Sequence, residues 1–441
     1  MENKGRIAIL GGGLSGLAVG YILSQKGWNV EILEKESECG GLMRSLQEDG
    51  FTFDISGSHV IFSKDKEALN FMLNLLGDNK VKNKRNTKIL YKGRYIKYPF
   101  ENGLADLPKE ENFECLYYFI VNLIKKEKGE IKPPKNLKEW FYYMFGKGMA
   151  EKYLIPYNEK IWKYPPEGIS VEWVERIPNP PIEDIIKSSL GIETEGYTHQ
   201  LYFYYPKRGG IQALIRSLES RIRGTIIRNF EVREIRKEDG VWIVSNGKYE
   251  KIYDRIISTI PIFDLVNAVN PERGVRKAVE KLMYNSLITV MISVDAPRLD
   301  DFSWLYIPDK NVLPHRVSFP SNYSPYVAPE GKSTVLAEIT CRPSDKIWRM
   351  RDEKILDEVI KQLHELKIIN EDKVCYHNIK RLKYAYVIYD LEYRKNIEIV
   401  RSYFKKIGID LIGRFSEFEY MNMDACIRHA IDFARRFENA R

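Results

Sequence analysis

The chain has 441 residues, of which 44% are hydrophobic and 29% charged, so it is long enough to bury a large core in two or three domains. Its formal net charge of +8 is modest and spread along the chain, which favours an anionic ligand and argues against a nucleic-acid partner. The 5 cysteines are scattered without paired spacing, so we expect no disulfide framework, no metal site and a reducing compartment.

We expect neither a signal peptide nor a membrane-spanning helix. The first expected strand begins within a few residues of Met1, which predicts a cytoplasmic protein. The most apolar segment, residues 116–124, is about half the length needed to cross a bilayer. We therefore expect a core-facing helix there, with an interfacial membrane contact as the alternative.

The N-terminal region predicts a strand, a glycine-rich turn, a helix and a second strand. The apolar residues 7–10 run directly into residues 11–16, Gly-Gly-Gly-Leu-Ser-Gly, and residues 30–34 form the second strand. Such glycines allow a tight bend, close approach of a pyrophosphate and close helix packing, while the helix N-terminus offers free N–H groups to phosphates. An acidic residue about twenty positions on can hold a ribose hydroxyl. The predicted dinucleotide site includes Gly11, Gly13, Leu14, Ser15, Gly16, Glu34 and Lys35.

Two later segments favour FAD over NAD. Residues 39–44, Cys-Gly-Gly-Leu-Met-Arg, would bring the chain back across the pyrophosphate with an arginine as counter-charge. Residues 205–211 precede a helical stretch, and residues 230–235 then form a strand whose backbone could flank the adenine. Together with the N-terminal turn they resemble the flavoprotein class that contains amine oxidases, protoporphyrinogen oxidases and sugar-nucleotide mutases. The cofactor contacts expected in these segments are Gly41, Leu42, Arg44 and Val232.

The remaining elements follow from apolar periodicity and turn residues. Expected helices cover residues 68–76, 116–124, 140–145, 353–367 and a segment after Asn396. Expected strands cover residues 88–99, as a hairpin turning at Lys92 and Gly93, and residues 197–206, 285–345 and 373–384. The basic cluster of Lys82, Lys84, Arg85 and Lys88 is interpreted as a solvated surface.

These elements predict an α/β fold with a Rossmann-like FAD-binding domain, a helical domain and an antiparallel β-sheet domain. The FAD-binding domain is expected to combine residues 1–62, 207–285 and 396–441. A helical substrate domain is expected at residues 103–196. The antiparallel sheet substrate domain is expected to combine residues 86–102, 197–206 and 286–395.

Several short motifs follow one another along the chain. They are His59 within Gly-Ser-His-Val-Ile-Phe-Ser, Tyr-Pro-Phe-Glu-Asn at 98–102, Pro-Tyr-Asn-Glu-Lys-Ile-Trp at 156–162, Arg176, Arg316 followed by Ser-Asn-Tyr-Ser-Pro-Tyr at 321–326, Tyr386, Gly-Arg-Phe at 413–415 and Tyr420. In this order and spacing they resemble the UDP-galactopyranose mutases, particularly their eukaryotic branch, and the likeness extends over most of the chain.

The resemblance assigns roles to these residues. Arginines present planar, permanently charged forks that suit diphosphate oxygens, and tyrosine hydroxyls donate to the same oxygens. Asn158 and Trp162 lie one helical turn apart, so both can face one cleft. The implied catalytic residues are His59, Arg176, Arg316 and Arg414. The implied substrate contacts are Asn158, Trp162, Arg176, Arg316, Tyr323, Tyr386, Arg414 and Tyr420, and the further cofactor contacts are Ser58, His59, Gly413, Met423 and Asp424.

The reaction that the resemblance implies interconverts pyranose and furanose forms of a UDP-hexose, most simply UDP-galactose, for cell-surface glycan synthesis. In that reaction N5 of the reduced flavin would attack the anomeric carbon as UDP leaves, the sugar ring would open and close through another hydroxyl, and UDP would return. His59 would tune the flavin near N5 and O4. NAD(P)H or another donor would reduce the flavin, and no net oxidation of the sugar occurs.

Alternatives stay open at this point. A flavin oxidase or dehydrogenase acting on an amine or a porphyrin-like substrate would need an apolar cavity, and a flavin-bound scaffold would show no turnover. Ser58, Leu90 and Gln200 depart from the family pattern, which leaves the nucleobase pocket and the sugar preference open. The sequence does not indicate an oligomeric state.

Overall fold

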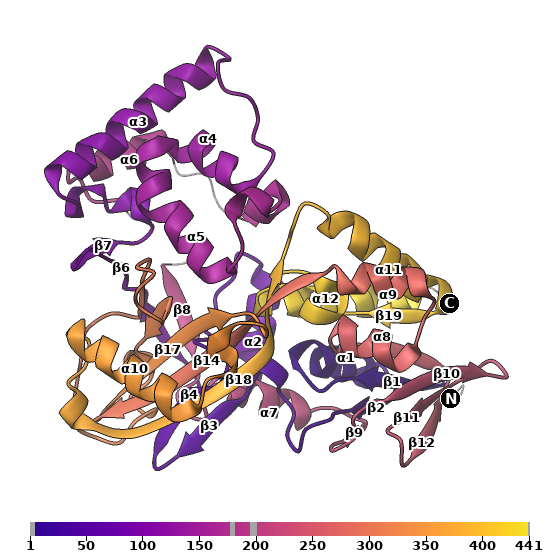
Figure 1. Ribbon diagram of the computed structural model, residues 1–441. Coiled ribbons are helices and arrows are strands. Elements are labelled where there is room, and N and C mark those ends of the chain that lie inside the picture. The colour runs from indigo at the N-terminus through magenta and orange to yellow at the C-terminus, as the bar shows by residue number, and fades with distance from the viewer. Residues whose placement is uncertain (1–4, 177–180, 195–200, 440–441) are drawn as a thin grey trace.

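The computed structural model describes residues 5–176, 181–194 and 201–439, and in this part of the chain three structural regions meet at the centre of the molecule (Figure 1). One region surrounds a parallel sheet, the second is a larger, mostly antiparallel sheet, and the third is helical. Among the described residues no helix is both long and apolar enough to span a bilayer.

The parallel sheet is buried on both faces. Its strands, in spatial order, are β19 (Ile409–Leu411), β13 (Arg255–Ser258), β1 (Arg6–Leu10), β2 (Asn29–Leu33) and β9 (Thr225–Ile227). Side chains alternate along β1, so Ile7 and Ile9 join one core cluster while Ala8 and Leu10 join another. This two-sided burial explains why the strand is apolar from Ile7 to Leu10.

Helices cover both faces of this sheet. One face carries α1 (Leu14–Gln25), α2 (Lys66–Leu76), α7 (Gln212–Glu219) and α12 (Met423–Asn439). The other carries α8 (Ile262–Val269), α9 (Arg273–Glu280), α11 (Tyr393–Ile407) and the small sheet of β10 (Glu234–Glu238), β11 (Val241–Ser245) and β12 (Glu250–Tyr253).

The larger sheet joins strands from the N-terminal and C-terminal halves of the chain. Its spatial order is β18 (Val374–Ile388), β14 (Met283–Val294), β17 (Ser333–Cys341), β16 (Arg316–Ser318), β15 (Trp304–Tyr306), β6 (Thr87–Tyr91) and β7 (Arg94–Lys97). All neighbours are antiparallel except β15 and β6, which run parallel. Helix α10 (Asp352–Glu365) packs on one face of this sheet.

The helical region contains α3 (Lys109–Glu127), α4 (Leu137–Met149), α5 (Ile155–Trp162) and α6 (Ile182–Ser189) around an aromatic core. Two short strand pairs connect the regions, β3 (Ser45–Glu48) with β4 (Phe51–Asp54) and β5 (Val81–Lys84) with β8 (Tyr202–Tyr205). Residues 116–124 lie in helix α3, as predicted, but only one face of this helix packs into the core. Phe119 is buried, whereas Ile120 and Ile124 stay exposed.

Other expected elements differ from the structure in their ends. Residues 230–233 precede β10 as irregular backbone, because the amide of Phe230 bonds the carbonyl of Glu34 beside the parallel sheet. The expected strand at 197–206 is reduced to β8 in the described part, since residues 195–200 lie outside it. The hairpin at residues 88–99 turns at Lys92 and Gly93, as predicted.

Candidate functional site

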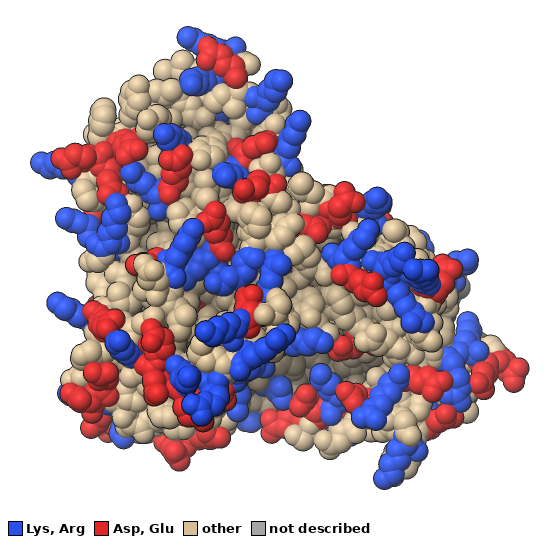
Figure 2. Space-filling model, in the orientation of Figure 1, with Lys and Arg blue, Asp and Glu red and all other residues tan. Residues whose placement is uncertain are grey.

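A cavity of about 790 Å³ lies where the parallel sheet, the larger sheet and the start of α12 meet. This volume is within the range of about 300–1,000 Å³ that is usual for ligand pockets. Lys and Arg side chains gather across the middle of the face drawn in Figure 2, and the cavity wall itself includes Arg85, Arg316, Arg381, Lys383 and Arg414. Lys35 and Arg44 also line it, as do the acidic residues Glu34, Glu36, Glu231, Asp264 and Asp424, so basic residues outnumber acidic ones in the wall.

One end of the cavity is a glycine cradle at the start of α1. Gly11 has a φ of +97°, a conformation that favours glycine. A Cβ atom on Gly13 would meet no protein atom within 4 Å, because this glycine lies open to the cavity. A Cβ on Gly16 would collide with the carbonyl oxygen of Gly11, so this glycine is needed for helix packing. Leu14 and Ser15 place the N-terminus of α1 at the cavity wall, as a phosphate group requires.

The acidic residue after β2 is fixed beside this cradle. Glu34 is 7% exposed, and its carboxylate accepts the amide hydrogens of Gly12 at 2.7 Å and Glu36 at 2.9 Å. Lys35, Gly41, Leu42 and Val232 also line this end of the cavity. Arg44 lines it too, but its guanidinium lies 3.6 Å from the Glu36 carboxylate, which offsets part of the expected counter-charge.

His59 is held as a neutral imidazole in the cavity wall. Its Nδ1–H donates to the carbonyl of Gly57 at 2.8 Å, which is the tautomer that leaves Nε2 as an acceptor. Removal from water, together with the positive charges of Arg316 and Arg414, lowers the pKa of His59 to about 4. The ring is therefore uncharged at neutral pH.

Arg316 is oriented by a buried carboxylate that the sequence analysis missed. Arg316 on β16 and Glu338 on β17 stand directly opposite one another, and two parallel bonds of 2.7 Å join the guanidinium to the carboxylate. Glu338 is fully buried and also accepts the amide of Ser58 at 3.3 Å. A Cβ on Gly57 would lie 2.5 Å from this carboxylate, so glycine is required in the loop. Glu338 thus fixes both Arg316 and the loop that carries His59.

Arg414 is held by the C-terminal segment. Its guanidinium donates to the carbonyls of Met421 at 2.5 Å and Ala385 at 2.8 Å, and its centre lies 4.3 Å from that of the Tyr420 ring. The buried Nε has no hydrogen-bond partner among the described residues. Gly413 packs against Ser15 at the start of α1, where a Cβ would collide with the serine side chain. Gly413 therefore supports the cradle from behind.

Tyr386 and Tyr420 are stacked in the cavity wall, with ring centres 6.3 Å apart and planes 14° apart. Trp162 supports both rings by edge contacts with ring centres at 6.0 Å. Trp162 is 2% exposed and donates to Asn158 at 2.9 Å, and Asn158 in turn donates to the carbonyl of Leu154. The predicted direct substrate contact of Trp162 needs correction, because this buried ring lies behind Tyr386 and Tyr420. Asn158 is half-buried and does not line the cavity, and its substrate contact stays a prediction.

Four further residues singled out in the sequence either lie away from the cavity or fall, wholly or in their side chains, outside the described part of the chain. Tyr323 is buried away from the cavity, where its hydroxyl accepts from Ser58 and donates to the carbonyl of Ser303, both at 2.8 Å. Leu90 is buried in the core under α10, so it does not face the cavity. The side chain of Arg176 and all of Gln200 lie outside the part of the chain that the structure describes.

The sequence analysis also missed an aromatic part of the cavity wall. Arg85 lies between two rings, 4.7 Å from the centre of Tyr98 and 4.8 Å from the centre of Trp304. Tyr306 lines the same part of the wall. The interpretation of Arg85 as solvated surface is wrong, since local charge density does not reveal the rings that stack on it. Tyr98 could have been found, because it belongs to the Tyr-Pro-Phe-Glu-Asn motif.

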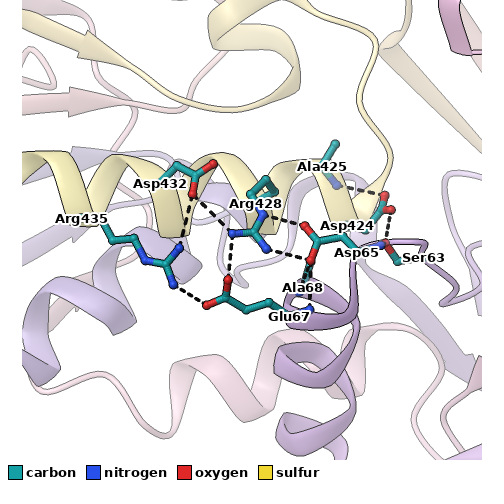
Figure 3. Close-up of polar contacts among 9 residues, drawn as sticks. All are labelled: Ser63, Asp65, Glu67, Ala68, Asp424, Ala425, Arg428, Asp432 and Arg435. Atoms are coloured by element: carbon teal, nitrogen blue, oxygen red, sulfur yellow. Dashed lines mark hydrogen bonds and ion pairs between the residues drawn. The ribbon is translucent and has the colours of Figure 1, made fainter.

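The loop after His59 is tied to the start of α12 by polar contacts (Figure 3). Ser63 donates to Asp424 at 2.5 Å, and Met423 and Asp424 line the cavity. One turn further on, Arg428 forms two bonds of 2.6 and 2.7 Å with Asp65, the residue that caps α2. This network sets the position of α12 relative to the His59 loop.

Comparison with known proteins agrees with this geometry. Residues 9–75 match the family of NAD(P)-binding Rossmann-like domains, and residues 186–394 match the flavin containing amine oxidoreductases. The chain has an FAD-binding α/β fold. The predicted fold class is thus confirmed, and the matches indicate a flavin cofactor, for which the open space above Gly13 and the N-terminus of α1 are suited.

Two solved structures illustrate the likeness of fold. A crystal structure of a reduced UDP-galactopyranose mutase is 24% identical, with a TM-score of 0.88 over 99% of this chain and 96% of that one. A putrescine oxidase bound to putrescine is 16% identical, with a TM-score of 0.70 over 99% of both chains.

Curated relatives match over shorter segments. Protoporphyrinogen oxidase 2 of Arabidopsis thaliana is 24% identical over 182 residues, which are 38% of this chain and 34% of that protein. A 4,4'-diapophytoene desaturase of Methylomonas is 46% identical over 61 residues, which are 14% of this chain and 12% of that protein. The chain thus spans about a third or less of the length of these relatives.

Proposed function

We propose that this protein is a flavin-dependent sugar-nucleotide mutase that interconverts the pyranose and furanose forms of a UDP-hexose, with UDP-galactose as the first candidate substrate. The observation that carries the proposal is the placement of two permanently charged guanidinium groups, on Arg316 and Arg414, in one cavity with the dinucleotide cradle. Such groups suit a diphosphate, whereas an amine substrate would not need them. The likeness of fold to a UDP-galactopyranose mutase along the whole chain supports the same choice.

Each part of the wall has a role in this proposal. Arg316 and Arg414 stabilise the charge that develops on the departing UDP, and the hydroxyls of Tyr386 and Tyr420 donate to the same diphosphate. The aromatic wall around Arg85 offers flat surfaces for a nucleobase.

A bound, reduced flavin would supply the nucleophilic nitrogen of the reaction. Glu34 and the cradle of Gly11 and Gly13 would hold its adenosine diphosphate half, and His59 would accept a hydrogen bond through Nε2 near the reacting ring. Neutral His59 adds no positive charge beside this ring, so the cationic character of the site stays with the arginines.

The deciding experiment compares redox states of the FAD-loaded protein. Dithionite-reduced protein is incubated with UDP-galactose without oxygen, and a furanose product is sought by chromatography. We expect many turnovers without consumption of stoichiometric reductant, a flavin that stays reduced, and no turnover by oxidised protein. Equal turnover by the oxidised protein, or no furanose product from the reduced protein, would contradict the mutase proposal.

The second candidate is an FAD-dependent oxidase or dehydrogenase of the amine oxidase or protoporphyrinogen oxidase type. The match of residues 186–394 to flavin containing amine oxidoreductases favours it. In that case substrate would bleach the oxidised flavin, and oxygen would restore its colour. Screening amines and a protoporphyrinogen under air, with flavin absorbance as the readout, separates the two candidates.

The mutase proposal also requires an electron donor. NADH and NADPH are the first donors to test, by following loss of flavin absorbance under anaerobic conditions. If neither reduces the flavin while dithionite supports turnover, another donor serves the protein.

A further inference from the structure

Helix α3 carries a row of exposed apolar side chains that the fold leaves uncovered. Phe113, Tyr117, Ile120 and Ile124 are exposed by 69%, 50%, 39% and 50%. Their spacing of four, three and four residues puts them on one face of the helix. The opposite face, with Cys115 and Phe119, is packed into the helical core. We call the exposed row the α3 stripe.

The stripe lies apart from the cavity. The rings of Phe113 and Tyr117 stack on each other with centres 5.9 Å apart. Helix α3 runs along the outer edge of the helical region (Figure 1), and it contributes no residue to the cavity wall. Its buried side and Glu111 contact the β6–β7 hairpin, on the side of the helix away from the stripe. A contiguous apolar row of this kind marks an interaction surface more often than an ordinary solvated helix face.

Charges at the two ends of α3 indicate which partner fits. The first turns contain Glu110, Glu111 and Glu114 against one base, Lys109, and the last contain Lys125, Lys126 and Lys128 against one acid, Glu127. Glu111 and Glu114 already pair with Lys92 and Lys152 of the same subunit, so Glu110 is the acid of the first turns left for a partner. A second copy docked antiparallel places each acidic end, with the positive end of its helix dipole, beside the basic end of the other. Parallel docking would bring like-charged ends together, which is unfavourable.

The same arrangement gives a specific register. With the apolar row centred on the two-fold axis, Tyr117 of one copy meets Ile120 of the other, and Phe113 meets Ile124. Lys109 and Glu127 lie five helical turns apart on one flank of the stripe, so Lys109 of one copy faces Glu127 of the other. Glu110 and Lys128 are related in the same way on the other flank. Among the described residues, these four side chains form no ion pair within the subunit.

We propose that the α3 stripe is the contact surface for a second copy of this chain, which docks with its own α3 antiparallel across a two-fold axis. The surface would join the helical regions of two subunits and leave each cavity complete. The inference is independent of the reaction that the cavity carries out.

The first test measures the mass of the FAD-loaded protein in solution by sedimentation over a range of micromolar concentrations. We expect a dimer for the wild type. Ile120→Asp puts a charge at the centre of the apolar row and should raise the dissociation constant by about a hundredfold or more, since both copies then bury an unpaired carboxylate. The matched control is Ile399→Asp, which changes an isoleucine exposed by 43% on α11 and should leave the dimer intact.

A charge exchange tests the orientation. Lys109→Glu and Glu127→Lys each create two like-charged contacts in the antiparallel dimer, so each alone should raise the dissociation constant about tenfold. The combination of both substitutions in one chain restores opposite charges and should return the constant to near the wild-type value. Glu at position 109 and Lys at position 127 both interact favourably with the helix dipole, so neither substitution should unfold α3. Unfolding of the helix would therefore not explain a weaker dimer.

Several results would overturn the proposal. A wild-type monomer throughout the concentration range would do so, as would a dimer that Ile120→Asp leaves unchanged. Failure of the double exchange to restore association would reject the antiparallel arrangement. Binding of monomeric protein to phosphatidylserine-containing vesicles, abolished by Ile120→Asp, would instead assign the stripe to a membrane surface.

Discussion

At the scale of single residues, the candidate site depends on arginines whose directions are fixed by their neighbours. Arg316 is held by the buried carboxylate of Glu338, and Arg414 is held by two backbone carbonyls and the Tyr420 ring. Holding a cation in place before the ligand arrives reduces the entropy lost on binding. Because their directions are fixed, the two arginines select an anion by its shape as well as by its charge.

Replacing either arginine tests the anion site directly. Arg316→Ala or Arg414→Ala should weaken UDP binding by about 2 kcal/mol, as expected for a lost charge-assisted contact in a partly desolvated site. Calorimetry with UDP and flavin absorbance for FAD content are the measurements. FAD content should hardly change in Arg414→Ala, whereas Arg316→Ala leaves the buried Glu338 carboxylate unpaired beside the His59 loop and should also lower the stability of the protein. Arg298→Ala, at a guanidinium 67% exposed and outside the cavity wall, is the control. Unchanged UDP affinity in both cavity variants would remove the sugar-nucleotide proposal.

The neutral state of His59 predicts a pH dependence. Its pKa is about 4 in the folded protein and near its ordinary value of 6.5 when unfolded, so the unfolded chain binds more protons between these values. The free energy of unfolding should therefore decrease as pH falls from 6.5 towards 4, by more in the wild type than in His59→Gln. Urea unfolding of both FAD-loaded proteins at several pH values checks this. If the free energies of unfolding of the two proteins change equally with pH between 6.5 and 4, His59 is not desolvated in the folded protein.

At the scale of secondary-structure elements, the glycine turn before α1 separates two roles that look alike in the sequence. Gly13 has φ −76° and open space at its Cβ position, whereas a Cβ on Gly16 would collide with the backbone of the turn. Gly13→Ala should thus give a folded protein that has lost FAD, because the methyl group occupies the space of the pyrophosphate. Gly16→Ala should fail to fold stably. Circular dichroism and flavin absorbance distinguish these outcomes, and a yellow Gly13→Ala protein would argue against the cradle.

The contact between α2 and α12 makes a second prediction at this scale. Arg428→Met removes the paired bonds to Asp65 and should lower the free energy of unfolding by about 1 kcal/mol, the upper range for exposed ion pairs. Hydrogen bonds from Arg428 lower the pKa of Asp65 to about 2, so this stabilisation is present above pH 4 and is lost as pH falls towards 2.

Urea unfolding at pH 7 and at pH 3 measures this difference. Arg435→Met is the matched control, because it changes a more exposed arginine of the same network (Figure 3). It should lower the free energy of unfolding by less than Arg428→Met does. The free energies of unfolding of wild type and Arg428→Met should differ less at pH 3 than at pH 7. An equal difference at both pH values would contradict the role of the Arg428–Asp65 pair.

At the scale of the whole molecule, the cavity wall is assembled from segments between Gly11 and Cys426 that come from both sheets and the C-terminal helix. A ligand that fills it can bind only the folded chain. Removing FAD should therefore lower the unfolding midpoint, and free FAD at 100 times its dissociation constant should restore about 2.7 kcal/mol. Scanning calorimetry with and without added FAD is the measurement. Identical midpoints would show that FAD does not occupy this space.

Features set by local sequence were predictable from the chain alone. The run at residues 7–16 indicates a strand, turn and helix because tight turns need glycine and buried parallel strands need continuous apolar residues. Alternating and helical periodicities likewise identified the hairpin at residues 88–99 and helices α2 and α10. The family motifs led to His59, Arg316, Arg414, Tyr386 and Tyr420, which the structure gathers in one cavity.

Tertiary structure decided which side chains face that cavity. Strand register places Glu338 opposite Arg316, and helix packing puts Trp162 behind Tyr386 instead of in the cavity. Arg85 lines the wall only because Tyr98 and a distant strand bring their rings to it. Local sequence encodes propensity and periodicity, whereas these positions depend on pairings between residues far apart in the chain. Those pairings are fixed only when the sheets and helices pack together.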